Sequence, residues 1–239
     1  MRIISKIETK TGWTVKGRKL EGIRKLGKPE EFAYKYYNSG VDEIIFLDSV
    51  ASLYGRGTLD EVIEKVSENV FVPMTVGGGI RKLNDCKRMF ESGADKISLN
   101  TILFEDPSIL KKISKIYGSQ ALVVEVQAKK IDNGYECLCE YGREFTGINL
   151  IDWLKKLRGF PIGELHLISV DKDGMNQGVD KELIEISREF IEVPFIYSGG
   201  FNPLKDDLKW LSQYLEGLCM ASCLHLHSVD PSKFSQRCN

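Results

Sequence analysis

VPMTVGGGIR, at residues 72–81, returns in altered form as VPFIYSGGF at residues 193–201. Pro73 and Pro194 hold the same place in the two copies and lie 121 positions apart. In each copy a short apolar, β-prone run leads directly into glycines, which is typical of a strand that ends in a tight loop. A repeat at half the length of the chain indicates that the protein is built from two similar halves.

The repeat extends outward from these two stretches. Before them come IIFLDS, around Asp48, and HLISVDKDG, around Asp171; after them come DKISLNT (95–101) and LCMASC (218–223). The outermost runs, KIETK and EVQAK, align at an offset of 119, which puts Glu8 and Gln127 at equivalent positions. We therefore expect two half-barrels, of about residues 1–120 and 121–239.

β-prone runs alternate with segments of helical period along the whole chain, which favours βα units and a parallel sheet. Eight such runs and the two-fold repeat predict one (β/α)8 TIM barrel over residues 1–239, with a doubly wound open sheet as the alternative. Strands are expected near 2–8, 43–48, 72–76, 95–99, 121–127, 164–169, 193–197 and 218–222. Helices are expected near 29–39, 58–68, 82–92, 107–117, 149–158, 179–190 and 204–214.

Composition narrows the class of function. The chain has 239 residues, 42% of them apolar, and a net charge of −1. This balance argues against nucleic acid or a membrane surface as the main partner. No apolar run approaches the ~20 residues of a membrane span, and MRIISKIE is too short and too charged for a signal peptide. The six cysteines follow no disulfide pattern, so we expect reduced thiols and a cytoplasmic location.

No metal or cofactor site is predicted. Cys137 and Cys139 have no second pair of ligands at zinc-binding spacing. His225 and His227 are expected in an exposed loop. His166 is the only other histidine, so the sequence offers few residues for a nucleophilic triad based on histidine.

Two segments between expected elements are unusually long, residues 9–28 and 128–147. Both follow a strand, so they lie at the carboxyl-terminal face of a barrel, where barrel enzymes carry their chemistry. Long segments at this place are typical of lids or binding loops. A small hairpin is expected within the second.

Glycines end the third and seventh strands, and Asn100–Thr101 and Ala221–Ser222 end the fourth and eighth. Glycine lets backbone N–H groups approach an anion, and helix N-termini favour anions. Each neighbouring pair of loops is therefore predicted to hold one phosphate, which implies a ligand with a phosphate at each end. The alternative is that these glycines only turn a strand into a helix.

Charged residues begin four of the expected strands: Arg2, Glu43, Lys96 and Glu164. They would lie together at the amino-terminal face, the floor of the barrel. Two cations and two anions there are expected to pair as a ring. The alternative is that they only keep an exposed floor soluble.

The sequence resembles the HisF/HisA family of histidine biosynthesis, and HisF more closely. The resemblance rests on FLDSVAS (46–52), TVGGGIR (75–81), GADKISLNT (93–101), YGSQALVV (117–124), ISVDKDGMNQG (168–178) and SGG (198–200). It implies the cyclase subunit of imidazole glycerol phosphate synthase. That subunit receives ammonia through the barrel from a glutaminase, HisH, and joins it to a bis-phosphorylated ribulosyl substrate at the carboxyl-terminal face.

The resemblance also implies roles for individual residues. The family's phosphate contacts fall on Gly79, Asn100 and Thr101 at one end, and on Gly200, Ala221 and Ser222 at the other. Its substrate-contacting lysine falls on Lys16, and its strand-six aspartate pair on Asp171 and Asp173, with Asp48 nearby. Its charged ammonia gate falls on Arg2, Glu43, Lys96 and Glu164.

The acid–base positions depart from the family. HisF uses an aspartate at the ends of strands one and five, where this chain has Glu8 and Gln127. Glutamate is one methylene longer, and a misplacement of about 1 Å can cost on the order of 10²-fold in rate. An amide neither takes nor gives a proton, a loss of typically about 10²–10⁴-fold. Glu125, two residues earlier, is expected to lie deeper and out of reach.

Three functions follow as expectations. The first draws on HisF paralogues encoded with surface-polysaccharide genes, which work with a HisH-like glutaminase and a third, ATP-dependent sugar amidotransferase. It is a barrel that channels ammonia for amidation of a nucleotide-linked sugar. The second is an active cyclase that uses Glu8. The third is a HisA-type isomerase, which needs no ammonia gate; the floor charges and the YGSQ stretch weigh against it.

Overall fold

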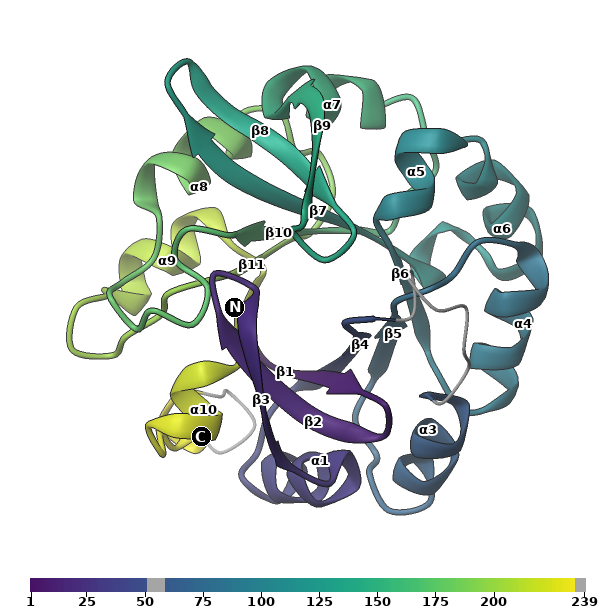
Figure 1. Ribbon diagram of the computed structural model, residues 1–239, viewed down its shortest axis with the longest axis vertical. Helices are drawn as coiled ribbons and strands as arrows, with labels where there is room; N and C mark the ends of the chain where they lie inside the picture. The colour runs from purple at the N-terminus through teal and green to yellow at the C-terminus, as the bar shows by residue number, and fades with distance from the viewer. Residues whose placement is uncertain (51–58, 235–239) are drawn as a thin grey trace.

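Eight parallel strands close into a barrel in the computed structural model of the chain, which describes residues 1–50 and 59–234. Each strand pairs with its neighbours in chain order, and the last pairs with the first (Figure 1). The predicted (β/α)8 barrel is confirmed. Residues 51 and 52 of the FLDSVAS motif, and Cys238, lie outside the described residues. The barrel strands are β1 (Arg2–Lys10), β4 (Glu43–Asp48), β5 (Met74–Gly77), β6 (Lys96–Leu99), β7 (Leu122–Ile131), β10 (Glu164–Ser169), β11 (Phe195–Ser198) and β12 (Gly217–Met220).

Helices form a ring outside the strands (Figure 1). The described residues include all seven expected helices and two short additional ones, α5 and α10, that follow β6 and β12 directly. In α7 the Asn149 side chain accepts from the Ile151 N–H at the first turn, and the buried face recurs at helical spacing. None of the helices in the described ranges is long and apolar enough to span a membrane. The helices are α1 (Pro29–Asn38), α3 (Leu59–Ser67), α4 (Leu83–Glu91), α5 (Thr101–Glu105), α6 (Ile109–Tyr117), α7 (Leu150–Leu157), α8 (Lys181–Arg188), α9 (Leu208–Tyr214) and α10 (Ser222–Leu226), with 3₁₀ turns η1 (Ser119–Ala121) and η2 (Pro231–Lys233).

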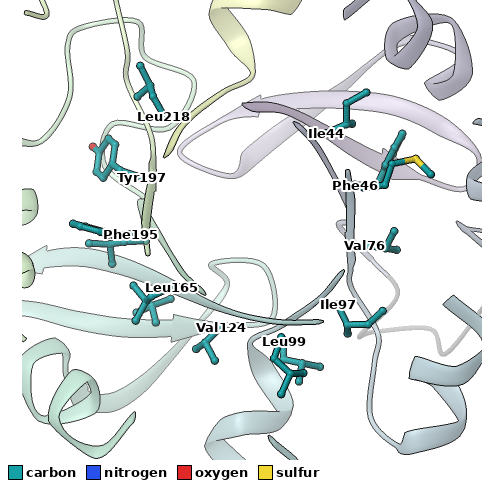
Figure 2. Packing of buried hydrophobic residues seen from close by; sticks show 14 of the residues in the cluster. Ile44, Phe46, Val76, Ile97, Leu99, Val124, Leu165, Phe195, Tyr197 and Leu218 are labelled. Carbon is teal, nitrogen blue, oxygen red and sulfur yellow. The ribbon is translucent and has the colours of Figure 1, made fainter. Parts of the chain in front are cut away.

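Side chains alternate between the two faces of each strand. Ile44 and Phe46 point outward and pack under the helices, as do their counterparts on the other strands (Figure 2). The inward side chains form a separate, smaller apolar cluster of Ile4, Ile45, Leu47, Ile196 and Cys219. Most of the core therefore lies between strands and helices. Inside the barrel this apolar cluster lies beside charged side chains, since Lys6 pairs in register with Ile45 and Glu8 with Leu47.

The duplication is visible in the elements themselves. β11, β12 and α10 begin 121 positions after β5, β6 and α5. Asn100 and Ala221, which precede the two short helices, share an unusual backbone conformation, with φ −132° and ψ −86° in one and φ −135° and ψ −79° in the other. Glu8 lies opposite Leu47 and Gln127 opposite Ile168, so the register places the two acid–base positions equivalently.

The two long segments expected to be lids are built as antiparallel hairpins. The strands β2 (Trp13–Arg18) and β3 (Glu21–Gly27) extend β1, and β8 (Gly134–Cys139) and β9 (Glu144–Asn149) extend β7. The two turns meet over the barrel mouth, where Leu20 and Tyr141 pack with Val170. The hairpins thus bring Lys16 and Tyr141 over the carboxyl ends of the barrel strands.

Candidate functional site

Two pockets open at the carboxyl ends of the strands. The first, of about 60 Å³, lies at the ends of β4 to β7; the second, of about 20 Å³, lies at the ends of β10 to β12 and β1. Asp48, Gly79, Asn100 and Thr101 line the first pocket. Asp173, Gly200, Ala221 and Ser222 line the second. The fold therefore gathers the expected phosphate-binding residues into two separate groups.

The glycine loops of the two pockets have the same construction. Gly78 has φ +102°, and a Cβ there would lie 2.5 Å from the carbonyl oxygen of Asp48. Gly199 has φ +121°, and a Cβ there would lie 2.7 Å from the carbonyl oxygen of Ser169. Both distances exclude a side chain, and both φ values disfavour L residues. Each loop can therefore pass this close to the next strand only as glycine.

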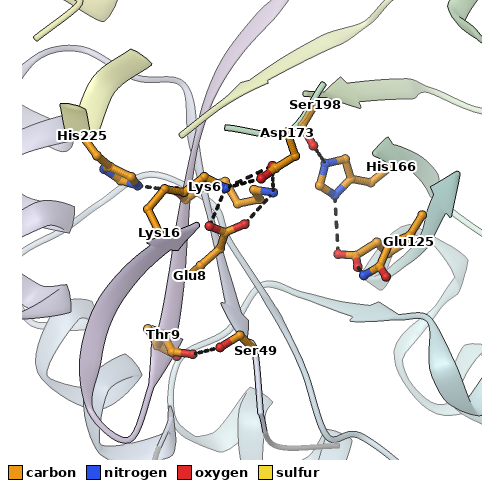
Figure 3. A network of polar contacts seen from close by, with 11 residues as sticks. Lys6, Glu8, Thr9, Lys16, Ser49, Glu125, His166, Asp173, Ser198 and His225 are labelled. Atoms are coloured by element: carbon orange, nitrogen blue, oxygen red, sulfur yellow. Dashed lines mark hydrogen bonds and ion pairs between the residues drawn. The ribbon is translucent and has the colours of Figure 1, made fainter. Parts of the chain in front are cut away.

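A buried cluster of four charges fills the barrel centre between the pockets (Figure 3). Glu8 is flanked by Lys6 Nζ at 2.8 Å and Lys16 Nζ at 2.7 Å. Asp173 contacts the same two amines, at 3.3 Å and 2.8 Å. All four side chains are at most 3% exposed. We call Lys6, Glu8, Lys16 and Asp173 the central quartet.

The quartet sets the ionisation of Glu8. Burial alone would raise the pKa of this carboxyl, but Lys16 and Lys6 outweigh burial and lower the pKa to about 2. Burial lowers the pKa of Lys6, yet Glu8 and Asp173 raise it above its usual range. Both groups therefore stay charged at neutral pH. A carboxylate this acidic and doubly paired is poorly suited to deliver a proton.

Glu125 lies two residues deeper on β7 than Gln127, as expected, but its side chain still reaches the first pocket. It lines that pocket together with Gln127, and its Oε1 accepts a hydrogen bond of 2.6 Å from Gln127 Nε2. Residues two apart on a strand share a face, and the flexible glutamate side chain extends toward the strand end. Burial raises the pKa of Glu125, although Lys6 and the bond from Gln127 oppose it.

His166 connects Glu125 to the second pocket. Its Nδ1 lies 3.9 Å from Glu125 Oε2, and its Nε2 lies 3.0 Å from Ser198 Oγ, which lines the second pocket. Burial, with help from the charge of Lys6, lowers the pKa of this imidazole to about 3. His166 is therefore neutral at physiological pH, with one ring nitrogen as donor and the other as acceptor.

The floor charges form a closed ring. Arg2 Nη1 contacts Glu43 at 2.7 Å and Glu164 at 2.9 Å. Lys96 Nζ contacts the same two carboxylates, each at 3.1 Å. The ring closes the amino-terminal end of the barrel. Its role as an ammonia gate stays a prediction.

Some expected groups lie elsewhere. Asp171 does not join Asp173: its Oδ2 accepts from the Lys130 backbone N–H, away from the quartet. The expectation that His225 is exposed is wrong, because its ring contacts the Tyr36 hydroxyl and the Lys6 carbonyl oxygen. The cysteines of the described residues are unpaired, and these residues hold no group of three or more potential metal ligands.

Sequence reasoning predicted no role for Lys6 or His166, and it set Glu125 aside. All three had a signal, since each is a titratable residue within an expected strand. Each also lies two positions from another singled-out residue (Glu8, Gln127 and Glu164) and so shares its face. Period-two alternation, applied to every strand, would have placed them inside the barrel.

Comparison of the sequence with known proteins finds relatives over nearly the whole chain. A family model described as "Histidine biosynthesis protein" matches residues 2–230. A Legionella pneumophila protein named "Imidazole glycerol phosphate synthase subunit HisF" is 40% identical over 207 residues, 86% of this chain and 98% of that protein. Proteins of the same name from Natranaerobius thermophilus and a Thermotoga species are 40% and 37% identical, each over 229 residues. These alignments cover 95% and 96% of this chain, and 91% and 90% of those proteins.

Proposed function

Because the chain belongs to the HisF family of histidine biosynthesis proteins, we propose that it is the barrel subunit of a glutamine-dependent complex of the imidazole glycerol phosphate synthase type. In this proposal a ligand with a phosphate at each end binds across the mouth. The observation that carries it is the pair of matched glycine-rich pockets on opposite sides of the barrel centre. One phosphate would sit in each.

The floor ring supports a partner at the opposite face. Arg2, Glu43, Lys96 and Glu164 surround the barrel axis at the end where ammonia from a HisH-like glutaminase would enter. A neutral molecule passes such a ring at lower cost than an ion, because the charges already satisfy one another. We infer that a glutaminase docks at this floor.

The first candidate for the ammonia acceptor is the bis-phosphorylated ribulosyl substrate, so that the chain is a cyclase in histidine biosynthesis. The name of the relatives described above favours it. That name also disfavours the HisA-type isomerase.

The second candidate is another acceptor, such as a nucleotide-linked sugar handled by a third subunit, with this barrel conducting ammonia. No name among those relatives mentions a sugar. A specific observation nevertheless favours a departure from ordinary cyclase chemistry: Glu8 is locked in the central quartet, and Gln127 is an amide that bonds Glu125.

One experiment separates the candidates. The purified chain is mixed with the bis-phosphorylated ribulosyl substrate and saturating ammonium at alkaline pH, so that no glutaminase is needed, and binding and product are both measured. Turnover supports the cyclase. Binding without turnover supports the second candidate. Absence of binding would refute the proposal that this chain holds a doubly phosphorylated ligand of this class.

A further inference from the structure

The first pocket holds more unsatisfied polar atoms than a folded interior normally keeps. Ser98 Oγ and Gln127 Oε1 are buried there without a hydrogen bond from the described residues. His166 Nδ1, behind the pocket, is in the same condition. A buried polar group without a partner is costly, so several in one place indicate a site for a polar ligand.

Glu125 stands at the centre of these atoms. Its Oε1 is held by Gln127 Nε2 at 2.6 Å, and its Oε2 faces His166 Nδ1 at 3.9 Å. The side chain is almost fully buried, yet it forms part of the pocket wall. A ligand in the pocket would therefore touch the carboxyl group of Glu125, which Gln127 already holds in place through Oε1.

We propose that Glu125, and neither Glu8 nor Gln127, is the residue that exchanges a proton with a ligand bound in the first pocket. The inference rests on the proposed function, and it moves the acid–base position two residues down β7. Gln127 and His166 are then positioning residues. The Gln127 amide fixes Oε1 of Glu125, and the His166 imidazole faces Oε2.

The charged and titratable groups around Glu125 come from every neighbouring strand. Lys6 and Glu8 on β1, His166 on β10 and Tyr141 on the β8–β9 turn act on it electrostatically. Cys219 on β12 and Asn100 after β6 also interact with it. Among these, Lys6 favours the carboxylate, while burial and Glu8 favour the acid. These opposing influences leave Glu125 able to hold a proton under conditions where Glu8 cannot.

The proton step is simple and needs no co-reactant. The protonated carboxyl of Glu125 gives its proton to an oxygen or nitrogen atom of the ligand, and the carboxylate that remains can later take a proton back. The tautomer of His166 with hydrogen on Nδ1 would donate to that carboxylate only after the two groups, now 3.9 Å apart, approached by about 1 Å. Nε2 then accepts from Ser198 Oγ, which lies 3.0 Å away.

Asp48 and Glu105 are the other carboxylates of the pocket. Asp48 accepts from the Val50 backbone N–H, which ties it to its own loop. Glu105 is exposed at the outer rim. Glu105→Gln is therefore a matched control: it removes a carboxylate from the same pocket, at a place where the proposal assigns no role.

The test measures protons exchanged on binding. The bis-phosphorylated ribulosyl substrate is titrated into the wild type, Glu125→Gln and Glu105→Gln by calorimetry, in buffers of different ionisation enthalpy, from about pH 5 to 9. We expect wild type and Glu105→Gln to exchange the same number of protons across this range. Glu125→Gln should differ from them by up to one proton per ligand, while keeping the wild-type far-UV spectrum.

The same proton number in Glu125→Gln as in the wild type would overturn the inference. If the substrate gives no binding heat with the wild type, the proposed function fails. That outcome differs from an unchanged proton number in Glu125→Gln. Where ammonium-dependent turnover is present, Glu125→Gln should lower it by about 10²–10⁴-fold. Full turnover in this variant would also overturn the inference.

A variant of His166 tests the positioning role. His166→Leu removes the ring nitrogen that faces Glu125, so the carboxylate loses its potential donor. We expect the pH at which binding exchanges a proton to move upward relative to the wild type. A residue that only filled space would leave this pH where it was.

Discussion

Replacing Glu8 by glutamine tests the central quartet. The change keeps the size of the side chain and removes its charge, so Lys6 and Lys16 are left with Asp173 as their only carboxylate within the quartet. Breaking a buried ion pair by removing one partner typically costs about 3–5 kcal/mol, because a buried charge is left uncompensated. We expect the free energy of unfolding at pH 7 to fall by this amount.

The pKa of Glu8 gives a second route to the same magnitude. The two lysines lower the pKa of this carboxyl from 4.5 to about 2. Since a tenfold change in acidity is worth about 1.4 kcal/mol, the ionised form contributes about 3 kcal/mol to stability. This contribution is present above the ordinary pKa of glutamate, and it is lost as the pH falls from about 4.5 to about 2.

The assay is urea unfolding followed by circular dichroism at pH 7, 5 and 3. The difference between wild type and Glu8→Gln should be similar at pH 7 and 5 and smaller at pH 3. Adding Lys6→Met to Glu8→Gln should restore most of the loss, because Lys16 and Asp173 then remain as one matched pair. The exposed Lys87–Glu91 pair supplies the control, and Glu91→Gln should leave stability unchanged.

A loss of unfolding free energy below about 1 kcal/mol at pH 7 would refute the reasoning. It would mean that removing the charge of Glu8 leaves no buried lysine uncompensated. A difference between the two proteins that does not shrink at pH 3 would also contradict it. The free energy of unfolding lost in Glu8→Gln would then come from packing around the side chain and not from its charge.

Three further predictions test other parts of the structure. A Cβ at Gly147 would have open space, so Gly147→Ala should lower the unfolding free energy by about 1–2 kcal/mol for the positive φ alone. A Cβ at Gly78 must also displace Asp48, so Gly78→Ala should lower it by more and should weaken ligand binding. Urea unfolding and a binding titration would show this, and equal costs would contradict it. Glu125→Gln should gain stability relative to the wild type as the pH rises above about 4, because the folded wild type holds a proton that the unfolded chain releases; a pH series of melting temperatures that stays parallel would contradict it. Lys96→Met opens the floor ring, so in the presence of the glutaminase it should lower the ratio of product formed to glutamine hydrolysed; an unchanged ratio would argue against a gate.

Much of the architecture was predictable because it depends on local pattern. Alternating apolar residues specify strands, and a repeat of strand, glycine loop and helix specifies parallel neighbours whose carboxyl ends meet. The positions of Gly79 and Gly200 at the mouth, and of Arg2 and Lys96 at the floor, follow directly from strand direction. Closure of the barrel then places the two glycine loops on opposite sides.

The pairing of side chains inside the barrel was not predictable in this way. Lys16 was expected to face a ligand, yet it contacts Glu8 and Asp173, the second of them 157 positions away in sequence. Glu125 was expected to be out of reach, and the length of its side chain brings it to the pocket wall. Such contacts depend on a few ångströms of side-chain reach and on which strands closure makes neighbours.

The sequence alone therefore determined the barrel, its two-fold repeat, the mouth loops and the charges of the floor, because each follows from the order and period of residues along single strands. Only the tertiary structure decided which charges neutralise one another and which carboxyl group faces the pocket. The physical reason is that burial and Coulomb interaction depend on distance in space, and the groups that set the ionisation of Glu8 and Glu125 come from separate strands and from a hairpin folded back over the mouth.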